Sequence, residues 1–322
     1  MSRNRPLVTI VGPTAVGKTR VSLRIADELN GEIISADSRL VYRGMDIGTA
    51  KPTSEERARV PHHLIDIVSP HEGFSLAEYR QAALRVINAV HLRGRLPLLV
   101  GGTGQYVMAV IEGWVPPPRP EDSSLRRELE TFAEEHGHEQ LHARLERIDP
   151  ARADAIDARN VRRVVRALEI YETTGVPPSE LRVKVPPPYD VLQIGLKLPR
   201  DELYERIDER IDRMLADGWL EEVEALLERG VPADSPALSA IGYRQLVDVL
   251  LGDRSLEDAK QEISQLTRRF VRHQGNWFSQ DDPEIHWFDS RPGVAEGITE
   301  FIGRWLRGEQ EADGHGPSTS SS

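Results

Sequence analysis

Short apolar segments alternate with helix-like segments over the first third of the chain. Residues 7–11, 32–36 and 96–100 are apolar runs of strand length. Residues 18–29 and 79–92 carry apolar side chains at the spacing of one helix face. Strands that alternate with helices predict a parallel sheet whose strands are connected by crossover helices. We therefore expect an α/β fold in which helices flank the sheet.

Two proline-rich segments interrupt this pattern at residues 115–120 and 185–188. The sequence between them is rich in Arg, Glu and Ala at helical spacing and contains no convincing strand. Proline stiffens a segment and stops a helix, so both segments predict the edges of a helical insertion. The expected organisation is a core at 1–115 and 190–307, a helical insertion at 116–189, and a polar, Gly/Ser-rich disordered tail at 308–322.

After the insertion, residues 191–198 are expected to return to the sheet as a strand, with helices following. Asp201 is expected to cap the first of these helices, and Ser255 with Asp258 predicts the start of another. The inward face of the first helix is predicted to be Leu203, Ile207, Ile211 and Leu215. The inward face of the second is predicted to be Leu256, Ala259, Ile263, Leu266 and Phe270.

Composition narrows the class of protein. A chain of 322 residues predicts about two domains, and 39% hydrophobic residues exclude a wholly disordered protein. The absence of cysteine excludes a disulfide scaffold, a thiolate zinc site and cysteine catalysis. The apolar run at 7–11 is too short for a secretion signal or a membrane span, so we expect a cytoplasmic protein that does not bind membranes. A net charge of -11 argues against a protein that coats nucleic acid, but it allows a local basic surface.

The clearest motif lies at residues 12–19, between the first strand and the first helix. It matches the G-x-x-x-x-G-K-[ST] pattern of a phosphate-binding loop: Gly12, Pro13, Thr14, Ala15, Val16, Gly17, Lys18 and Thr19. Glycines let the backbone wrap an anion, which then meets successive N–H groups and the positive end of the helix. Lys18 is expected to pair with the terminal phosphate, and the Thr19 hydroxyl is expected to bind Mg²⁺.

The remaining strand ends do not resemble those of a nucleotide-hydrolysing site. The strand at 96–100 ends in Gly-Gly-Thr-Gly and lacks the carboxylate that usually holds the metal. Asp37 instead ends the second strand and should face the same crevice, because ligands gather at the carboxyl ends of parallel strands. A carboxylate there can accept a proton or a hydrogen bond from an amine, although Asp37 could also merely cap a turn with Ser38. Asp66 is interpreted as structural.

Three long motifs together resemble the tRNA dimethylallyltransferases, also called the IPP transferase family. They are GPTAVGKT at 12–19, ISADSRLVYRGMDIGTAKP at 34–52 and LLVGGTGQY at 98–106. The resemblance continues to about residue 290. It implies a P-loop NTPase-like sheet and a monomer. It also implies transfer of a dimethylallyl group from dimethylallyl diphosphate to N6 of the adenosine 3′-adjacent to the anticodon, in tRNAs that read codons beginning with U.

The resemblance also implies roles for individual residues. Asp37 would accept the proton of the adenine amine, Thr103 would lie beside the reacting atoms, and Lys18 would stabilise the leaving diphosphate. The loop at 12–19 would bind the diphosphate together with Arg210. Arg206, Arg210 and Arg213 recur at helical spacing and should share one helix face.

The same resemblance, with the arginine content, places tRNA contacts in two regions. The expected tRNA-binding residues are Asp37, Ser38, Arg39, Leu40, Thr103, Gln105, Val161, Arg162, Arg163, Val164 and Val165. A second candidate cluster joins arginines with aromatic side chains that could stack on splayed bases: Arg268, Arg269, Arg272, Phe270, Trp277 and Phe278. The insertion would hold the anticodon stem-loop. The histidines show no metal-ligand spacing.

Three alternatives stay open at this stage. A small-molecule kinase would use the same loop on ATP, with the insertion as its lid. A non-catalytic RNA-binding protein could keep an inactivated loop, although intact Lys18, Thr19, Asp37 and Thr103 argue against it. A prenyltransferase acting on free adenine nucleotides would need neither the insertion nor the arginines at 159–166.

Overall fold

The computed structural model describes residues 5–117, 124–181 and 184–309, and it divides the chain into two compact units. The core unit combines Met1–Ile111 with Pro188–Ser322, and the insertion unit is Glu112–Pro187. Within the insertion unit, the N–H of Val185 donates to the carbonyl of Gly113 at 2.8 Å, so the two ends of this unit pair with each other. Most of the expected tail lies outside the described residues.

The core unit is built on a six-stranded sheet in the order β3-β2-β4-β1-β5-β6. Every neighbouring pair is parallel, which confirms the predicted α/β class. The strands are β1 Pro6–Val11, β2 Gly31–Ser35, β3 His62–His63, β4 Leu96–Val100, β5 Asp190–Lys197 and β6 Ile285–Asp289. The sequence patterns did not predict β3, which has only two residues, or β6, which mixes polar and apolar positions.

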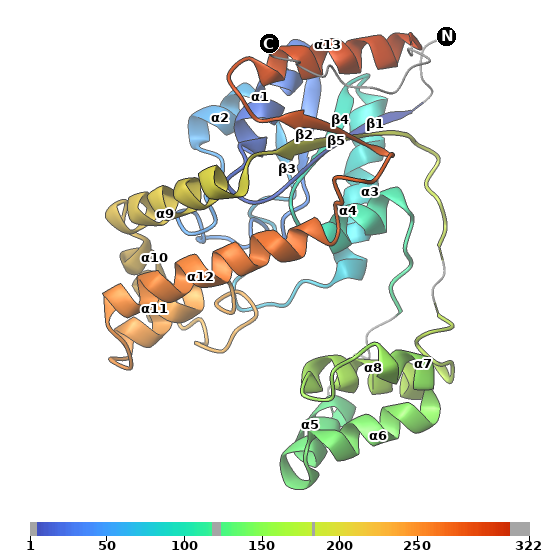
Figure 1. The fold of residues 1–322 in the computed structure, drawn as a ribbon, viewed down its shortest axis with the longest axis vertical. Helices are drawn as coiled ribbons and strands as arrows, with labels where there is room; N and C mark the ends of the chain where they lie inside the picture. The colour runs from blue at the N-terminus through green and yellow to red at the C-terminus, as the bar shows by residue number, and fades with distance from the viewer. Residues whose placement is uncertain (1–4, 118–123, 182–183, 310–322) are drawn as a thin grey trace, which may run out of the picture. The chain divides into compact units, whose positions relative to one another are not determined.

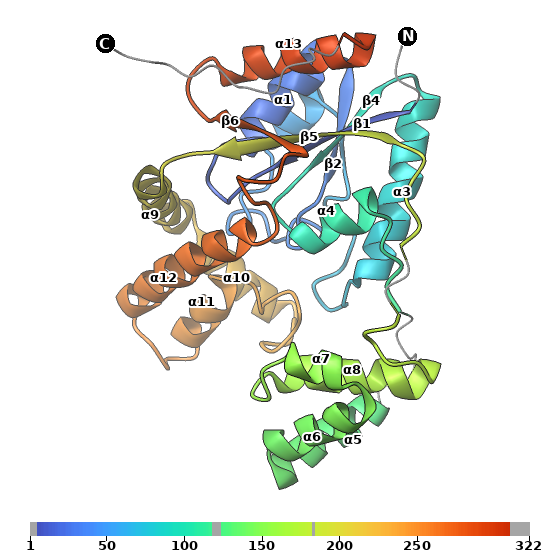
Figure 2. The ribbon, with the colours of Figure 1, turned by 45° about the vertical axis from the view of Figure 1, so that its right-hand side comes forward.

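Helices cover both faces of this sheet (Figures 1 and 2). Helices α1 (Lys18–Glu28) and α13 (Val294–Arg307) pack on one face, while α3 (Leu76–Leu92) and α4 (Gly104–Ile111) pack on the other. Val8 and Ile10 point into the first layer, and Leu7 and Val11 point into the second. Because both faces are buried, the central strands β1 and β4 are almost entirely apolar rather than alternating.

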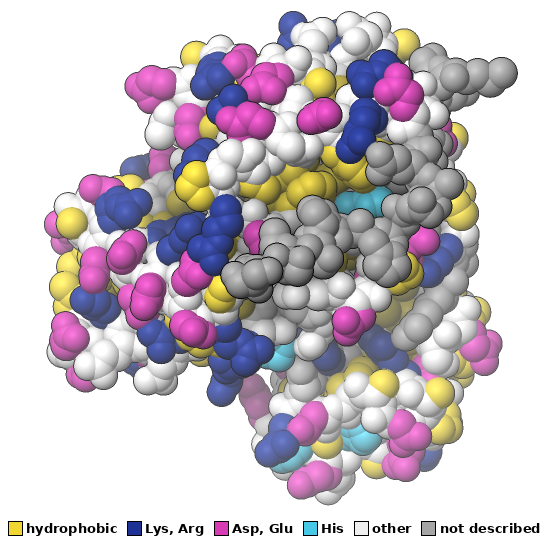
Figure 3. Space-filling view, turned by 45° about the horizontal axis from the view of Figure 1, so that its top comes forward, with side chains coloured by type: hydrophobic (Ala, Val, Ile, Leu, Met, Phe, Trp, Pro, Cys, Tyr) yellow, Lys and Arg dark blue, Asp and Glu magenta, His cyan; other side chains and the backbone are white. Residues whose placement is uncertain are grey.

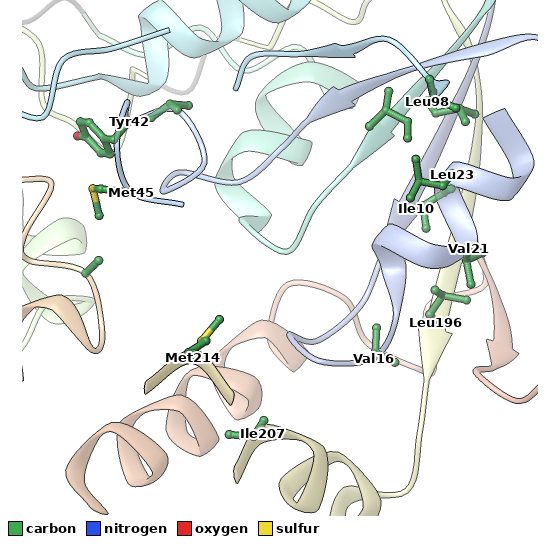
Figure 4. Packing of buried hydrophobic residues seen from close by; sticks show 14 of the residues in the cluster. Ile10, Val16, Val21, Leu23, Tyr42, Met45, Leu98, Leu196, Ile207 and Met214 are labelled. Carbon is green, nitrogen blue, oxygen red and sulfur yellow. The ribbon is translucent and has the colours of Figure 1, made fainter. Parts of the chain in front are cut away.

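The remaining helices of the core unit follow β2 or β5 in the chain. They are α2 Ser54–Arg59, α9 Arg200–Ala216, α10 Trp219–Glu228, α11 Tyr243–Leu250 and α12 Leu256–Gly275. Helices α9 to α12 pack on one another (Figures 1 and 2). Figure 4 shows Ile207 and Met214 of α9 in the same cluster as Val16 of the phosphate loop.

Two sequence expectations about these helices were wrong, the cap of α9 and part of the inward face of α12. Helix α9 begins after Pro199, so Asp201 lies in its first turn and does not cap it. Its fully buried face adds Met214, and the predicted Leu215 is partly buried and packs against the same core. Ser255 does cap α12, but Leu256 and Phe270 are 42% and 40% exposed.

The insertion unit is a small helical bundle, as expected from its composition. Its helices are α5 Ser124–His136, α6 His138–Ile148, α7 Pro150–Asp154 and α8 Val161–Thr174. Its core joins leucines of α5 and α6 to Val164, Val165 and Leu168 of α8. The carboxylate of Glu169 is buried beside it and accepts hydrogen bonds from Arg126 at 2.6 and 2.8 Å. Burial alone would raise the pKa of Glu169, but Arg126 holds it below its usual value.

Candidate active site

Three adjacent strands bring the predicted site segments together. β2, β4 and β1 are neighbours in the sheet, and they lead into Asp37, the turn at 101–104 and the phosphate loop respectively. Backbone hydrogen bonds continue past the strand ends: Gly101 donates to Ile10 at 3.2 Å, and Thr103 donates to Ala36 at 3.2 Å. A Cβ at Gly101 would lie 2.1 Å from the carbonyl oxygen of Ala36, so only glycine allows this close approach.

The phosphate loop has the backbone that its glycines predict. Gly12 has a φ of 140°, and a Cβ there would lie 2.4 Å from the carbonyl oxygen of Leu196. The Nζ of Lys18 donates to the carbonyls of Gly12 at 2.9 Å and Pro13 at 2.8 Å, which holds the amine over the loop. Burial lowers the pKa of Lys18 to about 8, opposed by the charge of Asp37 and assisted by that of Arg210.

A cavity of about 590 Å³ opens beside this loop, and we call it the basic cavity. Its cationic lining is Lys18, Arg20, Arg206, Arg210 and Arg213. The three arginines of α9 therefore share one face, as their spacing predicts. Burial lowers the pKa of Arg210, Asp37 opposes this change, and Arg213 adds to it. This concentration of positive charge suits a polyanionic ligand.

A second cavity of about 290 Å³, the apolar cavity, shares part of its wall with the basic cavity. The shared residues are Thr14, Ala15, Asp37, Thr49 and Arg210. Its apolar wall comes from α9, α10, α11, α12 and the segment before α11: Ile207, Ile211, Met214, Trp219, Ala240, Ile241, Tyr243, Ile263 and Phe270. A ligand with an anionic end and an apolar end would fit across the shared wall.

Asp37 lies at the junction of the two cavities. Its Oδ1 accepts the N–H of Arg39 at 2.8 Å, so Asp37 does cap a turn, through Arg39 and not through Ser38. The N–H of Ser38 donates to the Thr103 hydroxyl at 3.1 Å, which fixes the turn after β4 against the segment after β2. The carboxylate of Asp37 therefore faces both cavities from a fixed backbone.

The structure brings some of the predicted tRNA-binding residues to these cavities and not others. Ser38 and Arg39 line the apolar cavity, and Leu40 lines the basic cavity. The guanidinium of Arg39 donates to the carbonyl of Pro236 at 2.7 Å and so anchors this segment. Gln105, on α4, is exposed and lines neither cavity.

The candidate contacts in the insertion unit reduce to two exposed arginines. Val164 and Val165 are 0% exposed, so their side chains belong to the bundle core and are not available to an RNA surface. Val161 is partly buried at the start of α8, whereas Arg162 and Arg163 are exposed. The N-terminus of α8 is capped by Asn160, whose side chain accepts from the N–H of Arg163.

The second arginine–aromatic cluster is largely engaged within the protein. Arg268 pairs with Asp208 and lies over the Tyr204 ring, 5.1 Å from its centroid. Phe278 is buried, and the ring of Trp277 occupies the space that a Cβ on Gly104 would need. The expectation that the Phe278 ring is open to bases was therefore wrong, whereas Trp277 is partly buried and packs against the same core.

Sequence reasoning missed two residues that shape the site. Gln274 on α12 bonds to both the phosphate loop and the turn at 101–104. Glu222 on α10 accepts the N–H groups of Asp46, Ile47 and Gly48 at 2.6, 2.8 and 3.2 Å, and the Tyr243 hydroxyl at 2.5 Å. Glu222 thereby holds the loop that leads to Thr49. The sequence assigns neither residue a role, and only the folded chain reveals their contacts.

Asp66 is structural, as interpreted from the sequence. Its carboxylate pairs with the buried Lys51 at 2.5 Å and with Arg57 at 2.8 Å. Among the described residues, no three His, Cys, Asp or Glu side chains form a group that could hold a metal ion. The described helices include none with the length and apolar character needed to cross a bilayer.

The surface carries both signs of charge. On the face drawn in Figure 3, Lys and Arg side chains are interspersed with Asp and Glu side chains, and they form no continuous basic surface. This agrees with the formal net charge of -11. Recognition of a polyanion on this face would therefore depend on local groups of arginines rather than on the overall field.

The fold and the joined cavities define a class of protein: a phosphate-loop α/β protein whose basic cavity shares a wall with an apolar cavity. The chain belongs to the IPP transferase family, whose sequence model matches residues 40–281. A tRNA dimethylallyltransferase of Thermomicrobium roseum is 50% identical over 97% of this chain and 94% of its own length. One from Roseiflexus sp. strain RS-1 is 54% identical over 85% of this chain and 90% of its own.

Solved structures agree with this membership. The tRNA isopentenylpyrophosphate transferase of Bacillus halodurans is 44% identical, with a TM-score of 0.71 over 95% of this chain and 98% of its own. A eukaryotic dimethylallyltransferase described as acting on tRNA is 25% identical, with a TM-score of 0.82 over 98% of this chain and 82% of its own. The likeness extends over both units of this chain.

Proposed function

We propose that this protein transfers a dimethylallyl group from dimethylallyl diphosphate to N6 of the adenosine 3′-adjacent to the anticodon, in tRNAs that read codons beginning with U. Family membership and the names of the relatives support dimethylallyl transfer to tRNA. The observation that carries the proposal is the junction at Asp37, where a cation-lined cavity meets an apolar one. The products are N6-dimethylallyladenosine and diphosphate.

The basic cavity would hold the diphosphate. The loop N–H groups, Lys18 and Arg210 would neutralise the negative charge that grows on the leaving group as its bond to C1 breaks. Such groups act strongly because they are fixed before the reaction and partly shielded from water. The position of Lys18 over the loop, held by two carbonyls, is consistent with this role.

Asp37 would act on the nucleophile. The N6 amine is weakly nucleophilic because its lone pair is delocalised into the adenine ring. As N6 bonds to C1 and the C1–oxygen bond breaks, the surplus amine proton would pass to the Asp37 carboxylate. Thr103 would lie beside these atoms, since its hydroxyl is bonded to the N–H that follows Asp37. The apolar wall would limit water, which would otherwise hydrolyse the allylic diphosphate.

Magnesium fits the donor set of the basic cavity. Mg²⁺ commonly binds phosphate oxygens, waters and only one or two protein oxygens. Thr19 lines the basic cavity, and the described residues provide no group of three His, Cys, Asp or Glu side chains that could hold a metal ion. We propose that Thr19 and the diphosphate would hold the ion together, and that the ion would supply further charge neutralisation.

The insertion unit would bind the anticodon stem-loop, with Arg162 and Arg163 contacting phosphates. The adenosine must leave the loop stack to reach a cavity, which is the usual arrangement for enzymes that modify bases. One chain supplies every proposed group, so we propose a monomer. The tRNA substrate favours the cytoplasm.

A transfer assay tests the proposal against its alternatives. Labelled dimethylallyl diphosphate and Mg²⁺ are offered with unmodified tRNA, with AMP, or with neither, and ATP turnover is followed separately. Label in tRNA but not in AMP is the expected result. Label in AMP alone would indicate nucleotide prenylation, and ATP turnover without transfer would indicate a kinase.

A further inference from the structure

Gln274, near the end of α12, bonds to two loops of the site at once. Its side chain is buried, with only 4% exposed. Oε1 accepts the N–H of Thr14 at 2.9 Å, and Nε2 donates to the carbonyl of Gly102 at 3.0 Å. An N–H can only donate and a carbonyl can only accept, so these partners fix the orientation of the amide. A Gln side chain satisfies both loops with one rigid group.

The space between the loops is shaped for this amide. A Cβ at Gly102 would lie 2.2 Å from Nε2 of Gln274 and 3.4 Å from the carbonyl oxygen of Gly12. Gly102 does not have a positive φ, so its backbone conformation does not by itself require glycine. The missing side chain at Gly102 therefore leaves the room that the Gln274 amide occupies.

The two loops carry different parts of the proposed chemistry. Thr14 belongs to the phosphate loop, which carries Lys18, and it lines both cavities. Gly102 directly precedes Thr103, whose hydroxyl is bonded to the backbone beside Asp37. Gln274 thus spans from the segment that would hold the leaving group to the segment that would hold the base.

Gln274 also accepts one of the N–H groups of the phosphate loop. The N–H of Thr14 is already committed to Oε1, so the other N–H groups of the loop are left for an anion. Thr267 and Phe270, two turns and one turn earlier on α12 respectively, line the apolar cavity. One helix therefore contacts the phosphate loop, the turn before Thr103 and the apolar wall.

We propose that Gln274 is a positioning residue for the transfer reaction. It fixes the separation of the phosphate loop and the Thr103 turn, and so aligns C1 of the dimethylallyl group with the amine that attacks it. This inference rests on the proposed function. Gln274 acts through Thr14 and Gly102, so its loss should slow transfer at saturating substrates more than it weakens binding of either substrate.

Two variants of Gln274 separate its two hydrogen bonds. Gln274→Met keeps a side chain of similar length and removes both bonds. Gln274→Glu keeps an acceptor for Thr14, but an ionised carboxylate cannot donate to Gly102. A protonated carboxyl can donate, and burial raises a carboxyl pKa toward neutrality. Gln265→Met, at an exposed position on the same helix, is the matched control.

The measured quantities are the single-turnover rate of transfer to tRNA, the Kd for dimethylallyl diphosphate, and the rate between pH 5.5 and 8.5. Misplacement of reacting groups by about 1 Å can cost about 100-fold. We expect Gln274→Met to lose about 10- to 100-fold in rate, with a much smaller change in Kd. The rate of Gln274→Glu, divided by that of the wild type, should rise as the pH falls.

Three results would overturn the inference while leaving the proposed function intact, because wild-type transfer is measured in the same assay. They are a Gln274→Met rate within twofold of wild type, a Kd loss equal to the rate loss, and a flat pH ratio for Gln274→Glu. If neither variant folds, Gly102→Ala is used, because its methyl group would displace the amide. Its rate should fall similarly, and a wild-type rate would contradict the proposal.

Discussion

The basic cavity and the apolar cavity meet at Asp37, yet they are built in different ways. The basic cavity is organised around a phosphate loop of consecutive residues, 12–19, whose conformation follows from local sequence. The apolar cavity is walled by the four consecutive helices α9 to α12, which pack on one another, together with segments near residues 14, 37 and 103. The comparison shows that local sequence sets the phosphate loop of the basic cavity, whereas tertiary packing sets the shape of the apolar cavity.

The substitution Asp37→Asn tests the junction of the two cavities and should have the largest effect. An amide keeps an oxygen that can cap the N–H of Arg39, but it cannot take the amine proton. Loss of a general base typically costs about 100- to 10,000-fold, so turnover should fall by that amount. The tRNA Kd, measured by filter binding, should change little. Full activity would show that Asp37 only caps its turn.

Lys18→Ala tests the basic side. Removal of one fixed charge from a leaving-group site costs about 100- to 1,000-fold in turnover. The affinity for dimethylallyl diphosphate should also fall, because the loop loses its ammonium group. Steady-state kinetics and calorimetry measure both quantities. A defect in tRNA binding alone would contradict the assignment of this cavity to the diphosphate.

The pKa of Lys18 predicts that pH affects the function of the basic cavity. Lys18 is charged below a pKa of about 8 and neutral above it. The value of kcat/KM for dimethylallyl diphosphate should therefore fall as the pH rises through 8, approaching tenfold per pH unit. The Lys18→Arg variant stays charged, so its kcat/KM should not fall above pH 8 if it remains active. The same fall of kcat/KM in that variant would show that a group other than Lys18 causes it.

Tyr243→Phe tests the apolar side. It removes the hydroxyl that Glu222 accepts at 2.5 Å, next to the loop at 46–48. A hydrogen bond to a charged group contributes about 1.5–3 kcal/mol, so the free energy of unfolding should fall by that amount. The free energy of unfolding in urea is measured for this variant and, as a control, for Tyr171→Phe in the insertion unit. Equal stability losses would show that this network does not support the cavity.

The smallest expected effect belongs to the insertion unit. Replacing Arg162 and Arg163 with Ala should weaken tRNA binding without changing the single-turnover rate at saturation. If each arginine contacts one phosphate, the slope of log K against log salt should become shallower by about 1.4 to 1.8. Binding measured at several salt concentrations checks this. An unchanged slope would make these arginines ordinary surface residues.

The sequence predicted the parts of this molecule that local patterns control. The strands at 7–11 and 96–100 and the phosphate loop follow from apolar runs and fixed glycine spacing. The junction at Asp37 followed from the rule that parallel strands deliver their ends to one edge. The family resemblance supplied the proposed roles of Arg210 and Thr103, which spacing alone does not define.

Tertiary contacts explain what the sequence could not predict. Val164 and Val165 lie in a motif that resembles an RNA-binding segment, but the bundle needs them as core. Phe270 has core spacing on α12 and lines a cavity instead. Gln274 and Glu222 act on segments more than 170 positions away, through side chains that could equally be surface residues. No periodicity distinguishes such contacts.

The most direct test of the central claim is the identity of the modified nucleoside. Unmodified tRNA is incubated with the protein, dimethylallyl diphosphate and Mg²⁺, then digested and analysed by mass spectrometry. We expect N6-dimethylallyladenosine at the single position 3′-adjacent to the anticodon, and its absence with Asp37→Asn. Modification at another nucleotide, or the same product from Asp37→Asn at the wild-type rate, would contradict the central claim.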